Sequence, residues 1–176
     1  MTDARDFEAR VLPHLDAAFN LARWLTHDHH VAEDMVQEAY LRAFRYFDSA
    51  RPGDVKPWLM GIVRNNCYTW IEEKRIVRQQ VEVDDDLVNT LPTSDHGLGQ
   101  EPGKALDQVR LRKRVDDAIG ALAPPFREVI VLRELEGMSY EEIAQIASIP
   151  IGTVMSRLSR ARAELKAALA VLKGSQ

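Results

Sequence analysis

The sequence predicts an all-α chain of two small helical domains joined by a flexible acidic linker. Apolar residues recur at helical spacing through residues 7–78 and again through 104–172, and strand-like alternation is essentially absent. Residues 81–103, in contrast, show no sustained apolar period and are rich in turn-forming residues. These are Pro92, Gly97, Gly99, Pro102 and Gly103. We therefore expect two separate cores, in domains at 1–80 and 104–176.

Helices are expected throughout the first domain. Apolar residues recur from Phe7 to Leu25, where Pro13 opens a new helix or kinks the first. A polar turn at 27–30 leads to another helix, and a loop at 49–54 leads to a last one with a basic end at Lys74, Arg75 and Arg78. The buried stripes of these two helices are expected at Val36, Ala39, Ala43 and Phe47, and at Leu59, Ile62, Val63, Cys67, Trp70 and Ile71.

The second domain carries the pattern of a helix-turn-helix. Its first helix is expected to bury Leu106, Val109, Val115 and Ile119 and to end near Ala123, before Pro124 and Pro125. Further helices are expected at about 126–136, 140–147 and 151–172. Gly137 supplies a left-handed stop, and Ser139 with Glu142 forms an S-x-x-E capping box that fixes the next helix start. Residues 148–150 then form the tight turn.

The last helix separates a packing stripe from a polar arc. At 100° per residue, one stripe holds Val154, Leu158, Ala161 and Leu165, and an arc roughly 120° away holds Thr153, Ser156, Arg157, Arg160 and Glu164. Arginine can bond guanine bidentately in the major groove, and backbone N–H groups at Gly152 and Thr153 can approach a phosphate. The arginines alone also fit an ordinary solvated helix. Capping box, turn and arcs together favour DNA binding.

Two polar faces in the first domain are ambiguous on their residues alone. Leu41 is ringed by Asp34, Gln37, Glu38 and Arg45, which fits either a small protein-binding patch or a single exposed leucine. In the following helix, Asn65 can pair with a base edge and Tyr68 can stack on an unpaired base. Arg64, Asn65, Tyr68 and Thr69 equally fit the outer face of an amphipathic helix.

Four sequence runs resemble bacterial RNA polymerase sigma factors. AEDMVQEAYLRAF at 32–44 resembles the polymerase-binding helix of sigma region two, and PWLMGIVRNN at 57–66 resembles the adjoining promoter-melting helix. LRELEGMSYEEIA at 132–144 and IGTVMSRLSRAR at 151–162 resemble region four. No region three fits between them, so the chain resembles the extracytoplasmic-function (ECF) subfamily.

The resemblance implies a non-catalytic protein that directs core RNA polymerase to promoters, without metal or cofactor. Asp34, Gln37, Glu38, Leu41 and Arg45 would bind the clamp helices of the polymerase's largest subunit. Arg51, Asp54, Arg64, Asn65 and Tyr68 would bind the minus-ten element, and Thr153, Ser156, Arg157, Arg160 and Arg162 the minus-thirty-five element. Other implied partners are the flap region of the second-largest subunit and an anti-sigma factor. Met155 departs from the Lys or Arg common in relatives, which puts a DNA contact there in doubt.

Composition and sequence pattern also bear on the other classes of protein to which this chain could belong. Cys67 is the only cysteine, so it cannot form an intramolecular disulfide and is expected to be a packed, reduced core thiol. Without a signal-like N-terminus or a long apolar run, a cytoplasmic protein with no membrane insertion is expected. A stand-alone helix-turn-helix regulator is the main alternative. An enzyme is disfavoured because residues 27–34, although rich in His, Asp and Glu, point in divergent directions at a turn.

The linker carries most of the acidic character. The whole chain has a net charge of −4, and residues 81–103 hold six acidic residues with no Lys or Arg, so the remainder carries +2. As a free coil the linker spans about 26 Å and fully extended about 75 Å. If promoter elements lie roughly 35 to 70 Å apart, the linker must stretch, and we expect its acidic run to lie against basic walls of the nucleic-acid channel.

Neutralising Asp84, Asp85 and Asp86 should therefore weaken transcription initiation more than duplex binding by the second domain. Run-off transcription and a duplex-binding titration, performed on the same triple variant, measure the two effects. Equal losses in both assays would contradict this role.

Overall fold

The computed structural model describes residues 3–81 and 104–173, and every regular element within them is helical. The predicted linker lies outside the described residues, apart from Val81, which ends a helix. The prediction of an all-α fold is confirmed for the described ranges. The elements are α1 (Ala4–Val11), η1 (Leu12–His14), α2 (Leu15–Thr26), α3 (His29–Tyr46), η2 (Phe47–Ser49), α4 (Val55–Val81), α5 (Lys104–Ala121), α6 (Pro124–Ile130), η3 (Val131–Leu135), α7 (Tyr140–Ala147) and α8 (Ile151–Lys173).

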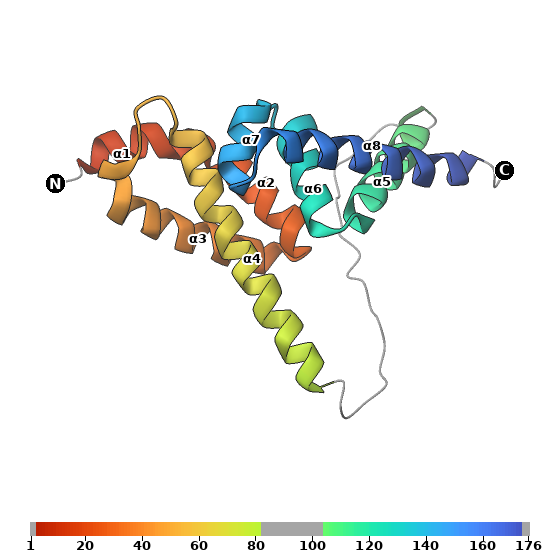
Figure 1. The fold of residues 1–176 in the computed structure, drawn as a ribbon, viewed down its shortest axis with the longest axis horizontal. Helices are drawn as coiled ribbons and strands as arrows, with labels where there is room; N and C mark the ends of the chain where they lie inside the picture. The colour runs from red at the N-terminus through yellow and green to blue at the C-terminus, as the bar shows by residue number, and fades with distance from the viewer. Residues whose placement is uncertain (1–2, 82–103, 174–176) are drawn as a thin grey trace.

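In the first domain, α2, α3 and α4 pack against one another, and α1 closes one end of the group (Figure 1). The ring of Phe7, on α1, contacts the rings of Tyr40, Phe44 and Phe47 edge to face, with centroids 5.0 to 5.2 Å apart. Pro13 lies in the 3-10 turn η1 between α1 and α2. The expected break at this proline is therefore confirmed.

Capping residues set the start of α3. The Asp28 side chain accepts a hydrogen bond from the Val31 backbone N–H at 3.0 Å, and His27 before it is left-handed, with φ 56°. The polar turn is thus His27 and Asp28, two residues shorter than predicted, because the capping aspartate lets the helix begin at His29.

The only cysteine is part of this core. Cys67 is fully buried on α4, and burial raises the pKa of its thiol to about 12. The thiol is therefore protonated at neutral pH and a poor nucleophile. This confirms the prediction of a packed core thiol.

The second domain follows the predicted helix-turn-helix, with local differences. Gly137 has φ +64° and ends the preceding helix, and both bonds of the Ser139–Glu142 capping box form, at 2.7 and 3.1 Å. Prolines are tolerated in the first helical turn, so α6 begins at Pro124, before the predicted start. Its last turn, η3, widens to a π-helix, and the Glu136 backbone N–H donates to the Val131 carbonyl at 3.0 Å.

The N-terminal half of α5 departs from the predicted burial. Val115 is partly buried and Ile119 is buried, whereas Leu106 and Val109 are 52% and 55% exposed. The helix periodicity is correct, but within the part of the chain that the structure describes the first turns of α5 leave their apolar side chains exposed, and Leu111 is 58% exposed as well.

The two domains pack against each other, which the prediction of separate cores did not anticipate. α4 contacts α7 and α2 contacts α6 (Figure 1). Buried apolar residues from both domains belong to one connected cluster. Gly61 of α4 lies beside the Ile146 backbone of α7: a Cβ at this glycine would be 3.8 Å from that carbonyl oxygen. We call this packing the interdomain contact.

Substituting Ser139→Ala should lower the free energy of unfolding by about 1 kcal/mol, because the Glu142 backbone N–H loses its capping acceptor. Urea denaturation of the full chain measures the loss. Ser159→Ala, at an exposed position within α8, is the matched control and should not destabilise the protein. A loss of the same size in both variants would contradict the role of the cap.

Candidate functional site

The outer face of α3 has the residues predicted to bind polymerase. Asp34, Gln37, Glu38 and Arg45 are all exposed, and they surround Leu41, which is 60% exposed. The opposite face packs inward through the fully buried side chains of Ala32, Ala39 and Ala43. Phe44 and Tyr46 add exposed aromatic surface near the end of the same helix, which the sequence analysis did not assign. An apolar patch with a polar rim is the usual composition of a protein-binding surface.

The loop before α4 positions two of the predicted minus-ten residues. Arg51 is exposed, and its carbonyl accepts the Asp54 backbone N–H at 3.0 Å. Asp54 is half-buried, and its carbonyl accepts the Trp58 backbone N–H at 2.9 Å. This tight turn places Arg51 and Asp54 at the N-terminus of α4. Asn65, further along that helix, is exposed.

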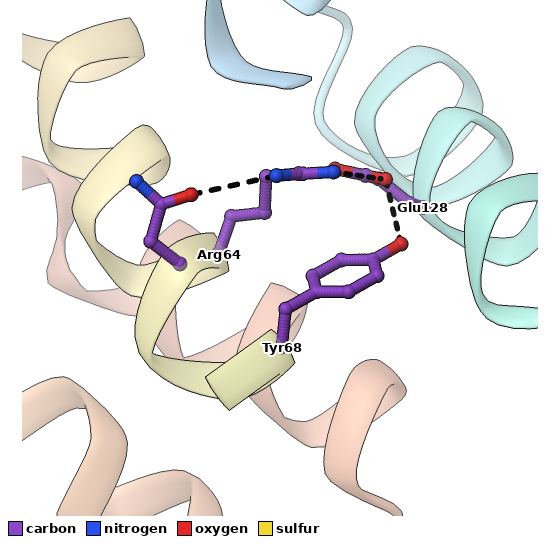
Figure 2. Close-up of polar contacts among 4 residues, drawn as sticks. Arg64, Tyr68 and Glu128 are labelled. Carbon is purple, nitrogen blue, oxygen red and sulfur yellow. Dashed lines mark hydrogen bonds and ion pairs between the residues drawn. The ribbon is translucent and has the colours of Figure 1, made fainter. Parts of the chain in front are cut away.

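The other two minus-ten candidates, Arg64 and Tyr68, bind a carboxylate from the second domain. Glu128 of α6 is fully buried, and it forms an ion pair with Arg64 of α4 (Figure 2). The Tyr68 hydroxyl donates to Glu128 Oε2 at 2.8 Å, and the Arg64 guanidinium lies over the Tyr68 ring, 4.3 Å from its centroid. Arg64 also donates to Asn65 Oδ1 at 3.4 Å. We call Arg64, Tyr68 and Glu128 the buried cluster.

Burial and the Glu128 charge shift the ionisation of both partners. Burial raises the pKa of the Tyr68 hydroxyl, and the neighbouring Glu128 carboxylate raises it further. Burial alone would lower the pKa of Arg64, but its hydrogen bond to Glu128 and the charge of that carboxylate outweigh burial and raise it. At neutral pH the cluster therefore holds a cationic arginine and a neutral tyrosine hydroxyl.

The stripe and arc predicted for the last helix lie as expected on α8. Val154, Leu158 and Ala161 are buried and Leu165 packs against the core, whereas Ser156 and Arg160 are exposed. The sequence analysis expected the backbone N–H of Thr153 to be available to a phosphate; this is wrong, because the group donates to the Pro150 carbonyl at 3.0 Å within the turn.

The arginines of α8 have different surroundings. Arg160 lies over the Phe126 ring, 5.1 Å from its centroid, and 3.7 Å from Glu164. Arg157 is half-buried, and its positive charge opposes the rise in the pKa of the Tyr68 hydroxyl. Arg162 faces away from the polar arc, half a helical turn from Thr153 by the 100° spacing. Its guanidinium bonds Glu134 Oε1 at 2.7 and 3.0 Å, and its contact with DNA stays a prediction.

Further polar contacts cross between the domains, and sequence reasoning missed all of them. The Asn20 side chain of α2 donates to Glu136 Oε1 at 2.6 Å, and Lys56 Nζ of α4 donates to the Glu136 carbonyl at 3.4 Å. Arg127 is buried, and it donates to the carbonyls of Trp24, Gly120 and Leu122 at 2.6 to 3.1 Å. Trp24 belongs to α2, and the other two carbonyls lie at the end of α5. Burial lowers the pKa of Arg127 to about 10.

Nothing in the described ranges forms a metal site or a membrane span. No three His, Cys, Asp or Glu side chains there gather in a metal-binding geometry. In the His-rich turn, His29 Nε2 lies 3.2 Å from Glu33 Oε1, an ordinary contact one helical turn apart. Among the described helices, none has the length and apolarity to cross a membrane.

Comparison with known families matches both domains. Residues 11–76 match Sigma-70 region 2, and residues 112–165 match Sigma-70, region 4. The chain is 32% identical to the ECF RNA polymerase sigma factor SigE of Mycolicibacterium smegmatis over 91% of its own length, and spans 60% of that relative. It is 32% identical to the ECF RNA polymerase sigma factor SigM of Bacillus subtilis, with 81% of this chain and 82% of the relative covered.

Solved structures agree with these matches. The sigma factor RpoE of Bartonella quintana, in complex with the anti-sigma factor NepR, superimposes with a TM-score of 0.77 at 30% identity. That match covers 96% of this chain and 99% of RpoE. CnrH in complex with the cytosolic domain of CnrY gives a TM-score of 0.63 at 25% identity, and covers 99% of this chain and 92% of CnrH. The chain belongs to the ECF family of RNA polymerase sigma factors.

Proposed function

We propose that this protein binds core RNA polymerase and directs it to particular promoters, acting in the cytoplasm without catalysis of its own. One chain carries both matched regions, and each presents a surface suited to its task. The α3 surface supports polymerase binding, α4 supports contact with a separated strand, and α8 supports duplex reading. A stand-alone regulator would have no use for the first two surfaces, so we set that alternative aside.

The α3 surface suits the clamp helices of the largest polymerase subunit. Leu41 is an apolar side chain that can be fully desolvated at the centre of an interface, and the surrounding charges form a solvated rim. The rim holds two acids, Asp34 and Glu38, and one base, Arg45, so it can pair with charges of both signs. Region four would in turn engage the flap region of the second-largest subunit.

The DNA-facing residues divide by the form of DNA that they suit. Tyr68 offers a stacking face for an unpaired base, Asn65 offers an amide for its edge, and Arg64 offers charge for a phosphate. On α8, Ser156, Arg157 and Arg160 project from the helix half that would enter a major groove. We assign the first set, with Arg51 and Asp54, to the minus-ten strand and the second set to the minus-thirty-five duplex.

An anti-sigma factor is proposed as a further partner. In the two solved structures described above, the sigma factor RpoE is bound to the anti-sigma factor NepR, and CnrH is bound to the cytosolic domain of CnrY. Because the match covers nearly the whole chain in each case, a protein of that class could use the equivalent surfaces here.

The direct test is to map transcript start sites made by core polymerase on genomic DNA with and without the full chain. New start sites that share upstream elements are expected. If core polymerase gains no start sites, the proposed function is wrong.

Leu41→Ala should weaken binding to core polymerase by about 2 kcal/mol, or roughly thirtyfold, because it removes the apolar anchor from a desolvated interface. A titration of labelled full-length protein with core polymerase measures the change. Leu111→Ala, at an equally exposed leucine on α5, is the matched control and should bind like the wild type. Equal affinities for Leu41→Ala and the wild type would remove α3 from the interface.

Arg160→Ala should cost about 1 to 3 kcal/mol in binding duplex DNA that carries the mapped minus-thirty-five element, and should relax preference at one base pair. Lys166→Ala removes the same charge from an exposed position outside the polar arc of α8, and should change affinity slightly and without sequence preference. Competition binding with single-base variants of the element separates the two effects. A uniform loss for both variants would mean that α8 binds DNA only by charge.

A further inference from the structure

The buried cluster uses residues that the proposed function assigns to DNA. Arg64 and Tyr68 are assigned to the separated minus-ten strand, yet in this structure both are bound to Glu128 of the second domain. The charge of Arg157, assigned to the minus-thirty-five duplex, acts on the same tyrosine hydroxyl. The two DNA-binding surfaces therefore meet at the interdomain contact.

This arrangement is incompatible with simultaneous reading of both promoter elements. Elements one to two turns apart require the two surfaces to be separated by roughly 35 to 70 Å. Here Tyr68 is within electrostatic reach of Arg157. In addition, Glu128 presents a carboxylate to Arg64, where a strand would present a phosphate.

We propose that Glu128 is an intramolecular latch: it occupies the strand-binding pair Arg64 and Tyr68, holds region four against region two, and must leave before the chain can engage a promoter. The latch rests on the proposed function for the identity of the masked ligand, single-stranded DNA. The domain contact itself does not depend on that identity.

The energetics of a buried ion pair suit a latch that can open. The free-energy cost of moving Glu128 and Arg64 out of water is almost as large as the gain from their attraction, so the pair adds little net stability to the closed arrangement. A purely apolar contact would favour the closed arrangement more strongly. Removing one partner is different, because the remaining buried charge is then uncompensated. Opening restores water to both groups and frees the arginine for a phosphate.

Other hydrogen bonds between the domains position Glu128 next to Arg64 and Tyr68. Arg127, the preceding residue, donates to the Trp24 carbonyl of α2, and Asn20 on the same helix donates to Glu136. These bonds fix α6 and the segment after it against α2. The carboxylate of Glu128 is thereby aimed at α4, as Figure 2 shows.

The test uses Glu128→Gln in the full chain, which removes the charge and keeps the side-chain volume. Arg64 would then be buried against a neutral amide, so the open population should rise by about tenfold or more. Small-angle X-ray scattering should show a more extended particle than the wild type. Fluorescence anisotropy with a labelled pool of random single-stranded DNA should show about tenfold tighter binding, because less of the protein is masked.

A second variant opens the interdomain contact from the other domain, in case Glu128→Gln disturbs the folding of region four. Asn20→Asp sets a carboxylate against Glu136 at a half-buried site, and like-charge repulsion should open the chain without touching the buried cluster. The control is Glu134→Gln, which breaks an exposed arginine pair within region four. It should scatter and bind the strand like the wild type.

The outcomes separate the latch from the proposed function. If neither Glu128→Gln nor Asn20→Asp extends the particle, the latch is wrong. If the particle extends and strand affinity stays unchanged, Glu128 does not mask the strand-binding pair. The scattering and strand-binding assays contain no polymerase, so their results do not depend on the start-site experiment. If core polymerase gained no start sites, the proposed function would be wrong, and the two assays would still test the latch.

Discussion

The interdomain contact depends on a carboxylate that is fully buried. Glu128 is fully buried, and an unpaired charge at such a position would be strongly destabilising. Its charge is balanced by Arg64 and its second oxygen accepts the Tyr68 hydroxyl. Because both partners lie on α4, the second domain can bury Glu128 in this way only against the first domain, and in one orientation. This requirement acts together with the shared apolar cluster and the bonds of Asn20, Lys56 and Arg127 to set the relative placement of the two regions.

This placement changes how the DNA-facing surfaces should be understood. The face of α3 that we propose binds polymerase and the α8 side chains Ser156 and Arg160 remain exposed. Arg64 and Tyr68, in contrast, are bound to Glu128 at the interdomain contact. In this arrangement the proposed polymerase surface is exposed while part of the proposed promoter surface is covered. A sigma factor with this arrangement would meet polymerase first and release its strand-binding residues afterwards.

Local features of this fold could be predicted from sequence because neighbouring residues determine them. The capping box at Ser139, the left-handed Gly137 and the α8 stripe each depend on residues within one or two turns. The interdomain contact could not be predicted, because Glu128 and Arg64 are far apart in the chain and each has an ordinary local context. The same limit explains why Leu106 was wrongly predicted to be buried. Helical spacing shows on which side of the helix a residue lies, but not whether another helix covers that side. Family resemblance supplied the assignment of Asn65 and Tyr68, which periodicity alone left open.

The most direct measurement of the central claim is the distance between the domains in the free protein and in its complex with core polymerase. Spin labels at introduced cysteines, Glu33→Cys on α3 and Ala163→Cys on α8, suit pulsed electron resonance because both sites are exposed and the native Cys67 thiol is buried. The account predicts one short distance in the free protein and a longer one on polymerase. The same distance in both states, or a broad range of long distances in the free protein, would contradict it.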